Sequence, residues 1–516
     1  MTRPPQSDAN APPLTRMSSL TRVSAIAALV AVGALAPLHA THAQTVYAPS
    51  PPRAVQPGVA ASHAKQATQT SALETAQELI RLGQYQRART IAAQALAVAR
   101  QHAPRTSETA DLINAMALAT YHAGNHAEAE PLYREALEIR RETFGDRHPD
   151  VAQSLNNLAE LLRATGRYDQ AEPLYIEALD IAREALGPRH PDTAAHLNNL
   201  ALLLKFTGRY DQAEPLYREA LDITREALGP RHPDTAKSLN NLAGLFFATG
   251  RYDQAERLYR EALDITREAL GPRHPDTATS LNNLALLLNA TGRYDQAEPL
   301  LVEALDITRE ALGPRHPTTA IRLNNLAGLL NATGRYDQAE PLYREALEIR
   351  RETFGDRHPD VAQSLNNLAG LLNATGRYDQ AEPLYREALE IRRETFGDRH
   401  PDVAQSLNNL ARLLDATGRY DQAEPFYVEA LDITREALGP RHPTTAASLN
   451  NLALLLEATG RPNDATPLFL DAVDILRTAL GDDHPSTRAG ARNTILHLRE
   501  HAPDHPDLPG LAAAFD

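Results

Sequence analysis

The chain has 516 residues, of which 42% are hydrophobic and only 5% aromatic, and it contains neither cysteine nor tryptophan. This composition favours thin layers of packed helices over one large globular core, and the lack of cysteine excludes disulfide bonds and a thiol-linked lipid anchor. The formal net charge of −14 argues against nucleic acid as the main partner, because binding to nucleic acid usually depends on a basic surface.

The N-terminal residues have the layout of a secretory signal. Arg22 precedes a run over residues 24–38 that is almost wholly Ala, Val, Leu and Ile, and a cleavage-site pattern ends at Ala43. We therefore expect an N-terminal extension and signal peptide in residues 1–43, cleaved after Ala43, and a protein that is periplasmic or secreted. The apolar run is shorter than the roughly 20 residues that span a bilayer comfortably, so an uncleaved membrane anchor is the less favoured alternative.

The rest of the chain divides into a linker, an array of repeats, a capping helix and a C-terminal tail. Residues 44–71 contain several prolines and predict a flexible linker. Residues 72–147 predict divergent N-terminal repeats, and residues 148–483 contain eight regular repeats of 42 residues. Residues 484–500 predict a C-terminal capping helix with a polar outer face, and residues 501–516 predict a loose tail.

Each repeat is marked by a His-Pro pair that recurs every 42 residues without a change of register. The pair predicts a helix start, because proline costs nothing in the first turn of a helix. Apolar residues at i, i+3, i+4 and i+7 then predict a first helix, a glycine ends it, and a second helix follows with a matching face. In residues 148–189 the first face is Leu155, Leu158, Ala159 and Leu162, the glycine is Gly166, and the second face is Ala171, Leu174, Tyr175, Ala178 and Ile181.

These residues resemble the tetratricopeptide repeat. The string LNNLAELLRATGRYDQAEPLYIEALDIAREALGPRHP is similar to the 42-residue kinesin light chain type of this repeat, and the resemblance covers about residues 72–500. It implies an all-α fold, a right-handed superhelical α-solenoid whose first helices line a concave groove. Such arrays serve as scaffolds, so the resemblance also implies a protein or an extended peptide as the partner.

Each regular repeat carries two adjacent asparagines on the first helix, opposite its apolar face. A carboxamide both donates and accepts hydrogen bonds, which suits the backbone of a bound peptide whatever its side chains are. The resemblance implies this role for the second asparagine of each pair, and we extend the prediction to the first. The alternative is that some asparagines bond between neighbouring helices and stabilise the stack. The first column is Asn156, Asn198, Asn240, Asn282, Asn324, Asn366, Asn408 and Asn450, and the second column is Asn157, Asn199, Asn241, Asn283, Asn325, Asn367, Asn409 and Asn451.

Other positions on this side of the first helix differ between repeats and would select the ligand. Arg163 and Lys205 bring positive charge and Phe247 brings an aromatic ring, so we expect an extended peptide with an acidic segment and an apolar anchor. The alternative is that these are ordinary solvated residues. The expectation also depends on Lys237, Arg322, Phe206, Phe246, Asp415 and Glu457.

No motif for catalysis, for a metal or for a phosphate group stands out. Histidines of successive His-Pro pairs would lie roughly 10 Å apart, whereas zinc ligands lie about 2 Å from one ion. The acidic residues recur at positions on the solvated surface of the helices, and no two of them stand out as a catalytic acid and base. We therefore predict a non-catalytic scaffold without cofactor or metal, which binds neither nucleic acid nor a small-molecule substrate. The alternatives are a self-assembling structural array and, if the N-terminal segment is uncleaved, a membrane-tethered scaffold.

Overall fold

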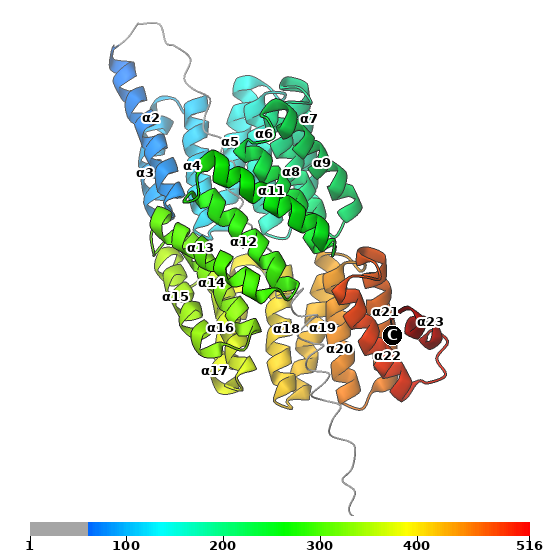
Figure 1. Cartoon of the computed structure of the whole chain (residues 1–516). Helices are drawn as coiled ribbons and strands as arrows, with labels where there is room; N and C mark the ends of the chain where they lie inside the picture. The colour runs from blue at the N-terminus through cyan, green and yellow to red at the C-terminus, as the bar shows by residue number, and fades with distance from the viewer. Residues whose placement is uncertain (1–59, 516) are drawn as a thin grey trace, which may run out of the picture.

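The chain forms a superhelix of paired α-helices (Figure 1). The structure is a computed structural model that describes residues 60–515, and every regular element in that range is a helix. The predicted all-α solenoid is confirmed, whereas the predicted signal peptide lies outside the described residues. The helices are α2 (Ala60–Arg81), α3 (Tyr85–His102), α4 (Ser107–His122), α5 (His126–Phe144), α6 (Pro149–Ala164), α7 (Tyr168–Ala185), α8 (Pro191–Phe206), α9 (Tyr210–Ala227), α10 (Pro233–Ala248), α11 (Tyr252–Leu270), α12 (Pro275–Ala290), α13 (Tyr294–Leu312), α14 (Pro317–Ala332), α15 (Tyr336–Phe354), α16 (Pro359–Ala374), α17 (Tyr378–Phe396), α18 (Pro401–Ala416), α19 (Tyr420–Ala437), α20 (Pro443–Ala458), α21 (Pro462–Leu480), α22 (Pro485–His501) and α23 (Leu508–Phe515).

Each regular repeat begins at its histidine, which caps the first helix. In α6, Nδ1 of His148 accepts a hydrogen bond from the backbone N–H of Asp150 at 3.2 Å, and Pro149 takes the first helical position. The helix ends at Ala164, and the turn after it contains Gly166, whose φ of +74° is accessible to glycine without strain and lets the chain reverse into α7. The prediction that the His-Pro pairs mark helix starts is confirmed.

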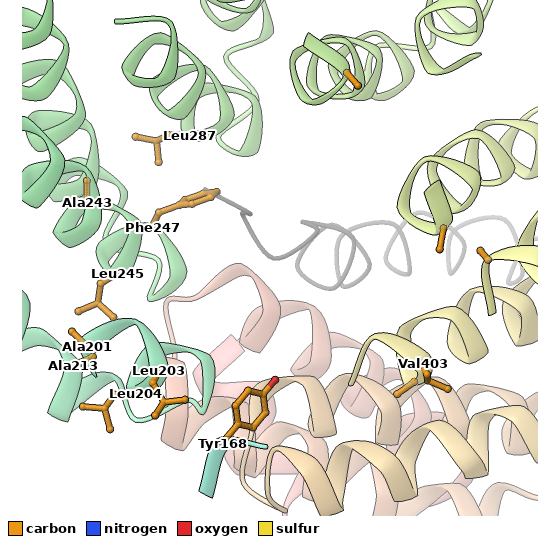
Figure 2. Close-up of a cluster of buried hydrophobic side chains, with 14 of the residues drawn as sticks. Tyr168, Ala201, Leu203, Leu204, Ala213, Ala243, Leu245, Phe247, Leu287 and Val403 are labelled. Atoms are coloured by element: carbon orange, nitrogen blue, oxygen red, sulfur yellow. The ribbon is translucent and has the colours of Figure 1, made fainter. Parts of the chain in front are cut away.

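The two predicted apolar faces pack against each other within every repeat. Leu155 and Leu162 of α6 and Ala171 and Tyr175 of α7 are all at most 1% exposed. Equivalent residues of the other repeats join the same hydrophobic core, part of which is drawn in Figure 2. Replacing one such leucine by alanine typically costs about 2–5 kcal/mol. Because the core runs between repeats as well as within them, neighbouring repeats depend on one another for stability.

The first helices lie on the inside of the curve. First helices of neighbouring repeats, such as α12 and α14, approach each other more closely than the second helices do. The second helices are joined instead by long side chains, as in the ion pairs of Arg183 with Glu219 at 2.9 Å and of Arg267 with Glu303 at 3.1 Å. Such exposed pairs are worth only about 0–1 kcal/mol each. The inner surface of the superhelix is therefore built by the helices that carry the paired asparagines.

Successive turns of the superhelix contact one another. The Nε2 atom of His442 lies 3.1 Å from the backbone carbonyl oxygen of Phe206, a residue 236 positions earlier. Since Nδ1 of His442 accepts a hydrogen bond from the N–H of Thr444, the ring proton is on Nε2, and Nε2 donates to the carbonyl. Figure 1 shows the same closure where α13 to α15 lie beside α2 to α4. We call this contact the seam, and its five pairs are Gly83 with His316, Gly124 with His358, Gly166 with His400, Gly208 with His442 and Gly250 with His484.

Both ends of the described chain are more ordered than the sequence predicted. Helix α2 begins at Ala60, so residues 60–71 are helical and the predicted linker is too long; residues 60–82 contain neither glycine nor proline to interrupt a helix. The prediction of a loose tail over residues 501–516 was also wrong, because α23 forms there and Leu511 packs into an apolar cluster with Val473 and Ile495. Between residues 60 and 515, no helix combines the length and the apolar character that crossing a membrane requires.

Candidate peptide-binding surface

The paired asparagines form a hydrogen-bonded ladder along the inner surface. Nδ2 of Asn325, in the second column, donates to Oδ1 of Asn282, in the first column of the preceding repeat, at 2.7 Å. First-column asparagines also bond forward, as Asn366 does when its Nδ2 donates to Oγ of Ser406 at 3.2 Å. The remaining ladder bonds run from Asn157 to Asn114, Asn199 to Asn156, Asn367 to Asn324, Asn409 to Asn366, Asn451 to Asn408 and Asn493 to Asn450.

The ladder gives the first column a structural role. Asn282, Asn324, Asn366 and Asn450 are buried, and a buried polar group left without its partner costs about 1–3 kcal/mol. The alternative that some asparagines stabilise the stack therefore holds for this column. The second column is half-buried along its whole length, and its contact with a peptide backbone stays a prediction, as does that of the half-buried members of the first column.

The ladder is interrupted in the middle of the array. Within the described residues, the side chains of Asn241 and Asn283 in the second column form no hydrogen bond. The side chains of the six other members of this column each donate one to an asparagine of the preceding repeat. The Oδ1 atoms of Asn198 and Asn240, which these two would reach in a regular ladder, are buried and have no hydrogen-bond partner in this part of the chain. Within the described part of the chain, two carboxamides on the inner surface thus have no hydrogen-bond partner.

A lysine lies beside this interruption. Nζ of Lys205 is 3.4 Å from the point where a Cβ on Gly244 would sit, and Gly244 follows Asn241 by three residues, about one helical turn. Burial lowers the pKa of Lys205 to about 8, so the side chain is still mostly protonated at neutral pH. No acidic side chain within residues 60–515 forms an ion pair with it. Phe247 follows one turn later, but it is only 7% exposed and belongs to the buried hydrophobic cluster drawn in Figure 2. Lys205 thus brings an uncompensated positive charge to this part of the surface.

Other predicted ligand contacts already have partners within the array. Arg163 pairs with Glu160 at 2.6 Å, and its guanidinium lies 4.7 Å from the ring centroid of Phe206. Phe246, Phe247 and Arg322 are only 3%, 7% and 2% exposed, so the expectation that they face a ligand was wrong. The column of Phe246 holds leucine in the other regular repeats, and the column of Arg322 holds serine in all of them except one, which has His196.

Gly244 lies in one of the columns that vary between repeats, and its contact with Lys205 is the feature of this surface that the sequence did not indicate. Its column holds Glu160 and Leu202 in earlier repeats and glycine again at Gly328 and Gly370. The ammonium of Lys205 approaches Gly244, whereas, in the described part of the chain, only a tyrosine hydroxyl approaches the other two glycines. The interruption of the ladder had no sequence signal, because the asparagine pairs are identical in all eight repeats.

Comparison with family models agrees with this architecture. The model described as tetratricopeptide repeat matches in overlapping segments that together extend over most of the chain. The chain belongs to the tetratricopeptide repeat family. The matched segments are residues 69–142, 108–175, 150–226, 192–268, 234–310, 276–352, 318–393, 360–436 and 416–478.

Several solved structures, some of them of kinesin light chain proteins, are similar to this tetratricopeptide array. One is a Podosopora anserina kinesin light chain protein with nearly identical TPR-like repeats, which is 26% identical, covers 40% of this chain and 97% of that chain, and has a TM-score of 0.34. Its Q17M form gives the same identity and coverage with a TM-score of 0.35. Another is BtubC (BKLC) from P. vanneervenii, which is 27% identical, covers 48% of this chain and 93% of that chain, and has a TM-score of 0.36. No curated protein matches the chain.

Proposed function

We propose that the array is a non-catalytic scaffold that binds an extended peptide along its inner surface, centred on Asn241 and Asn283. Tetratricopeptide repeats generally bind proteins or peptides. The observation that supports this location most strongly is the interruption of the ladder, because, among residues 60–515, it leaves two carboxamides without a hydrogen-bond partner beside the charge of Lys205.

The spacing of the repeats suits an extended chain. Adjacent first helices are roughly 10 Å apart, and an extended peptide advances about 3.3 Å per residue, so Asn241 and Asn283 would bond backbone groups about three residues apart. Beside Asn241, a carboxylate of the peptide would pair with Lys205, whose Nζ approaches Gly244 on the same helix. The ligand class is therefore an extended peptide that carries an acidic residue.

The direct test is selection from a displayed library of random peptides of about 12 residues, enough to cross four repeats of roughly 10 Å. We expect Asp or Glu to be enriched at one position by the full chain, and this enrichment to disappear with Lys205→Met. Enriched sequences that are the same for both proteins would contradict the assigned site, and the absence of any enriched peptide would contradict the peptide-binding function.

We also propose that the scaffold works outside the cytoplasm, on the basis of the signal-like residues 1–43. Cleavage after Ala43 would leave Gln44 as the first residue of the mature protein. Amino-terminal sequencing of protein from the exported fraction of the native host tests this. An intact amino terminus in the membrane fraction would favour the tethered scaffold, and an intact amino terminus in the cytosol would contradict export.

A second candidate function is end-to-end self-assembly, and the seam favours it. The edges that would extend the seam are exposed: a Cβ added at Gly334 or Gly376 would have no atom within 4 Å, and the side chains of His148 and His190 are 39% and 40% exposed. A second copy could place its histidine edge on the free glycine edge of the first. Such a contact joins two different surfaces and does not close on itself, so it would build filaments.

Sedimentation over a range of concentrations separates this candidate from the first. Self-assembly predicts species that grow with concentration and that shrink when Gly334→Ala and Gly376→Ala are combined. A monomer at every concentration would contradict self-assembly and would leave the peptide-binding function standing.

A further inference from the structure

The C-terminal end of the array brings together two histidines and a glutamate. His497 and His501 are four residues apart on α22 and therefore share one face, and Glu457 comes from the last turn of α20. Oε1 of Glu457 lies 3.4 Å from Nδ1 of His497 and 3.2 Å from Nε2 of His501. One ligand atom from each residue lies within 4.8 Å of the other two. The three side chains thus converge on one point between two helices that are far apart in the sequence.

The hydrogen bonds around His497 direct Nδ1 of its ring toward this cluster. Oγ1 of Thr466 donates to the backbone carbonyl of Pro462 at 3.0 Å, so it accepts in its 2.8 Å contact with Nε2 of His497. Nε2 therefore carries a ring proton, and Nδ1 of the same ring contacts Oε1 of Glu457 at 3.4 Å. This contact needs a positive species between the two atoms, which is either a second ring proton or a metal ion. The side chain of His497 is 0% exposed, so the pair lies away from bulk water.

We propose that Glu457, His497 and His501 bind one divalent transition-metal ion, with Zn²⁺ as the ion that suits them best. Two imidazoles and one carboxylate are a common ligand set for zinc, with bonds of about 2.0–2.2 Å. In a tetrahedron with bonds of this length, ligand atoms lie roughly 3.4 Å apart, which agrees with the separations of 3.4 and 3.2 Å around Oε1. Three protein ligands leave a fourth position for water or for a group of another molecule.

The surroundings have the features that metal sites require. Thr466 fixes the tautomer of one histidine, the role that a hydrogen-bonded neighbour of a ligand plays in most zinc sites. Phe469 covers the same ring at a centroid distance of 4.9 Å and shields it from water. The side chain of His501 is 27% exposed and gives an ion a path to the site. Bound metal would connect α20 to α22 and hold the capping helix on the end of the array.

Metal titration of the full, untagged chain tests this proposal. After treatment with a chelator, wild type and variants are titrated with Zn²⁺ by calorimetry, and circular dichroism checks that each variant is folded. Because His497 is fully buried, the ligand variants are Glu457→Gln and His501→Asn, and Thr466→Val probes the support of His497. The matched control is His102→Gln, which removes an exposed histidine far from the cluster.

We expect one Zn²⁺ per chain for wild type and for His102→Gln. The affinity should fall at least tenfold in Glu457→Gln and His501→Asn, and about 10–100-fold in Thr466→Val. Co²⁺ in place of Zn²⁺ should give the visible absorption of a tetrahedral ion in wild type and in His102→Gln, and this absorption should be weakened in the two ligand variants. A wild-type chain that binds no Zn²⁺, or folded ligand variants that bind it as tightly as wild type does, would overturn the proposal.

Discussion

The seam between successive turns should open when single carbon atoms are added to its glycine edge. A Cβ on Gly166 would lie 2.8 Å from Cδ2 of His400, well inside the ~3.5–4.0 Å of a normal contact between carbon atoms. Gly376 provides a matched control, because its φ is +75° against +74° for Gly166 and an added Cβ there meets no atom within 4 Å. The two substitutions to alanine therefore share the same backbone strain and differ in the seam contact.

The expected magnitudes follow from this difference. Alanine with a backbone in the left-handed region destabilises the folded state by about 1–2 kcal/mol. Alanine also has less conformational freedom than glycine in the unfolded chain, which stabilises the fold by roughly 0.4–1 kcal/mol. Gly376→Ala should therefore lower the free energy of unfolding by about 1 kcal/mol. Gly166→Ala adds a clash, and overpacking costs about 1–3 kcal/mol at each position. Three such clashes cost about 3–9 kcal/mol together, against about 1.5–4.5 kcal/mol for the three seam hydrogen bonds of His316, His358 and His442. The clashes therefore favour an open seam.

Small-angle X-ray scattering on dilute protein compares two triple variants. The seam variant, Gly124→Ala with Gly166→Ala and Gly208→Ala, should show a larger radius of gyration than wild type while its helical circular dichroism is kept. The control variant, Gly334→Ala with Gly376→Ala and Gly418→Ala, should scatter as wild type does. Identical scattering from the two variants, whether both compact or both extended, would refute the contact between turns.

Three further predictions concern the ladder, the lysine and the seam histidines. Asn325→Ala should lower the free energy of unfolding by about 1–3 kcal/mol, because it leaves the buried Oδ1 of Asn282 without a donor. Asn283→Ala should change this free energy by less than about 0.5 kcal/mol. Equal losses of stability in chemical denaturation would contradict the interrupted ladder. Affinity for an acidic peptide should fall as the pH rises through about 8, where Lys205 loses its charge, and Lys205→Met should remove this dependence; a wild-type affinity that is flat across this range would argue against the pairing. Burial lowers the pKa of His442 to about 4, against about 6.5 in an unfolded chain, so the stability of the seam should be complete above about pH 6.5 and be lost as the pH falls toward 4. Scattering that stays compact at pH 4 would show that these histidines do not hold the turns together.

The sequence was sufficient to predict the repeat unit because the same apolar spacing, glycine and His-Pro pair recur in every unit. The apolar spacing through Leu155 and Leu162, the glycine at Gly166 and the His-Pro helix start all depend on contacts within one repeat or with its neighbour. Such local patterns specify the helices and their pairing, and the structure confirms both.

The seam could not be predicted in the same way. It joins residues 236 positions apart, between five and six repeats of 42 residues, and depends on the small rotation that each repeat adds to the last. A slight change in that rotation would move His442 away from Phe206, and no residue pattern reports it. The sequence showed only a conformational reason for Gly208, whereas the structure adds a close approach.

The candidate sites show a similar limit. The asparagine pairs are identical in eight repeats, so the free carboxamides of Asn241 and Asn283 became visible only through the hydrogen bonds that the other repeats form. The spacing of His497 and His501 is a recognisable pattern on a helix, but their third partner, Glu457, lies forty residues before His497. It belongs to a column that holds arginine, lysine, phenylalanine, asparagine or aspartate in earlier repeats.

The central claim is that the interrupted part of the ladder holds the backbone of a peptide. The measurement that tests it most directly is the dissociation constant of one selected acidic peptide for two double variants, Asn241→Ala with Asn283→Ala, and Asn325→Ala with Asn367→Ala. The first variant should keep the stability of wild type and lose at least tenfold in affinity, whereas the second should lose stability and keep most of its affinity. An affinity that is unchanged in the first variant, or that falls only with the stability of the second, would contradict the account.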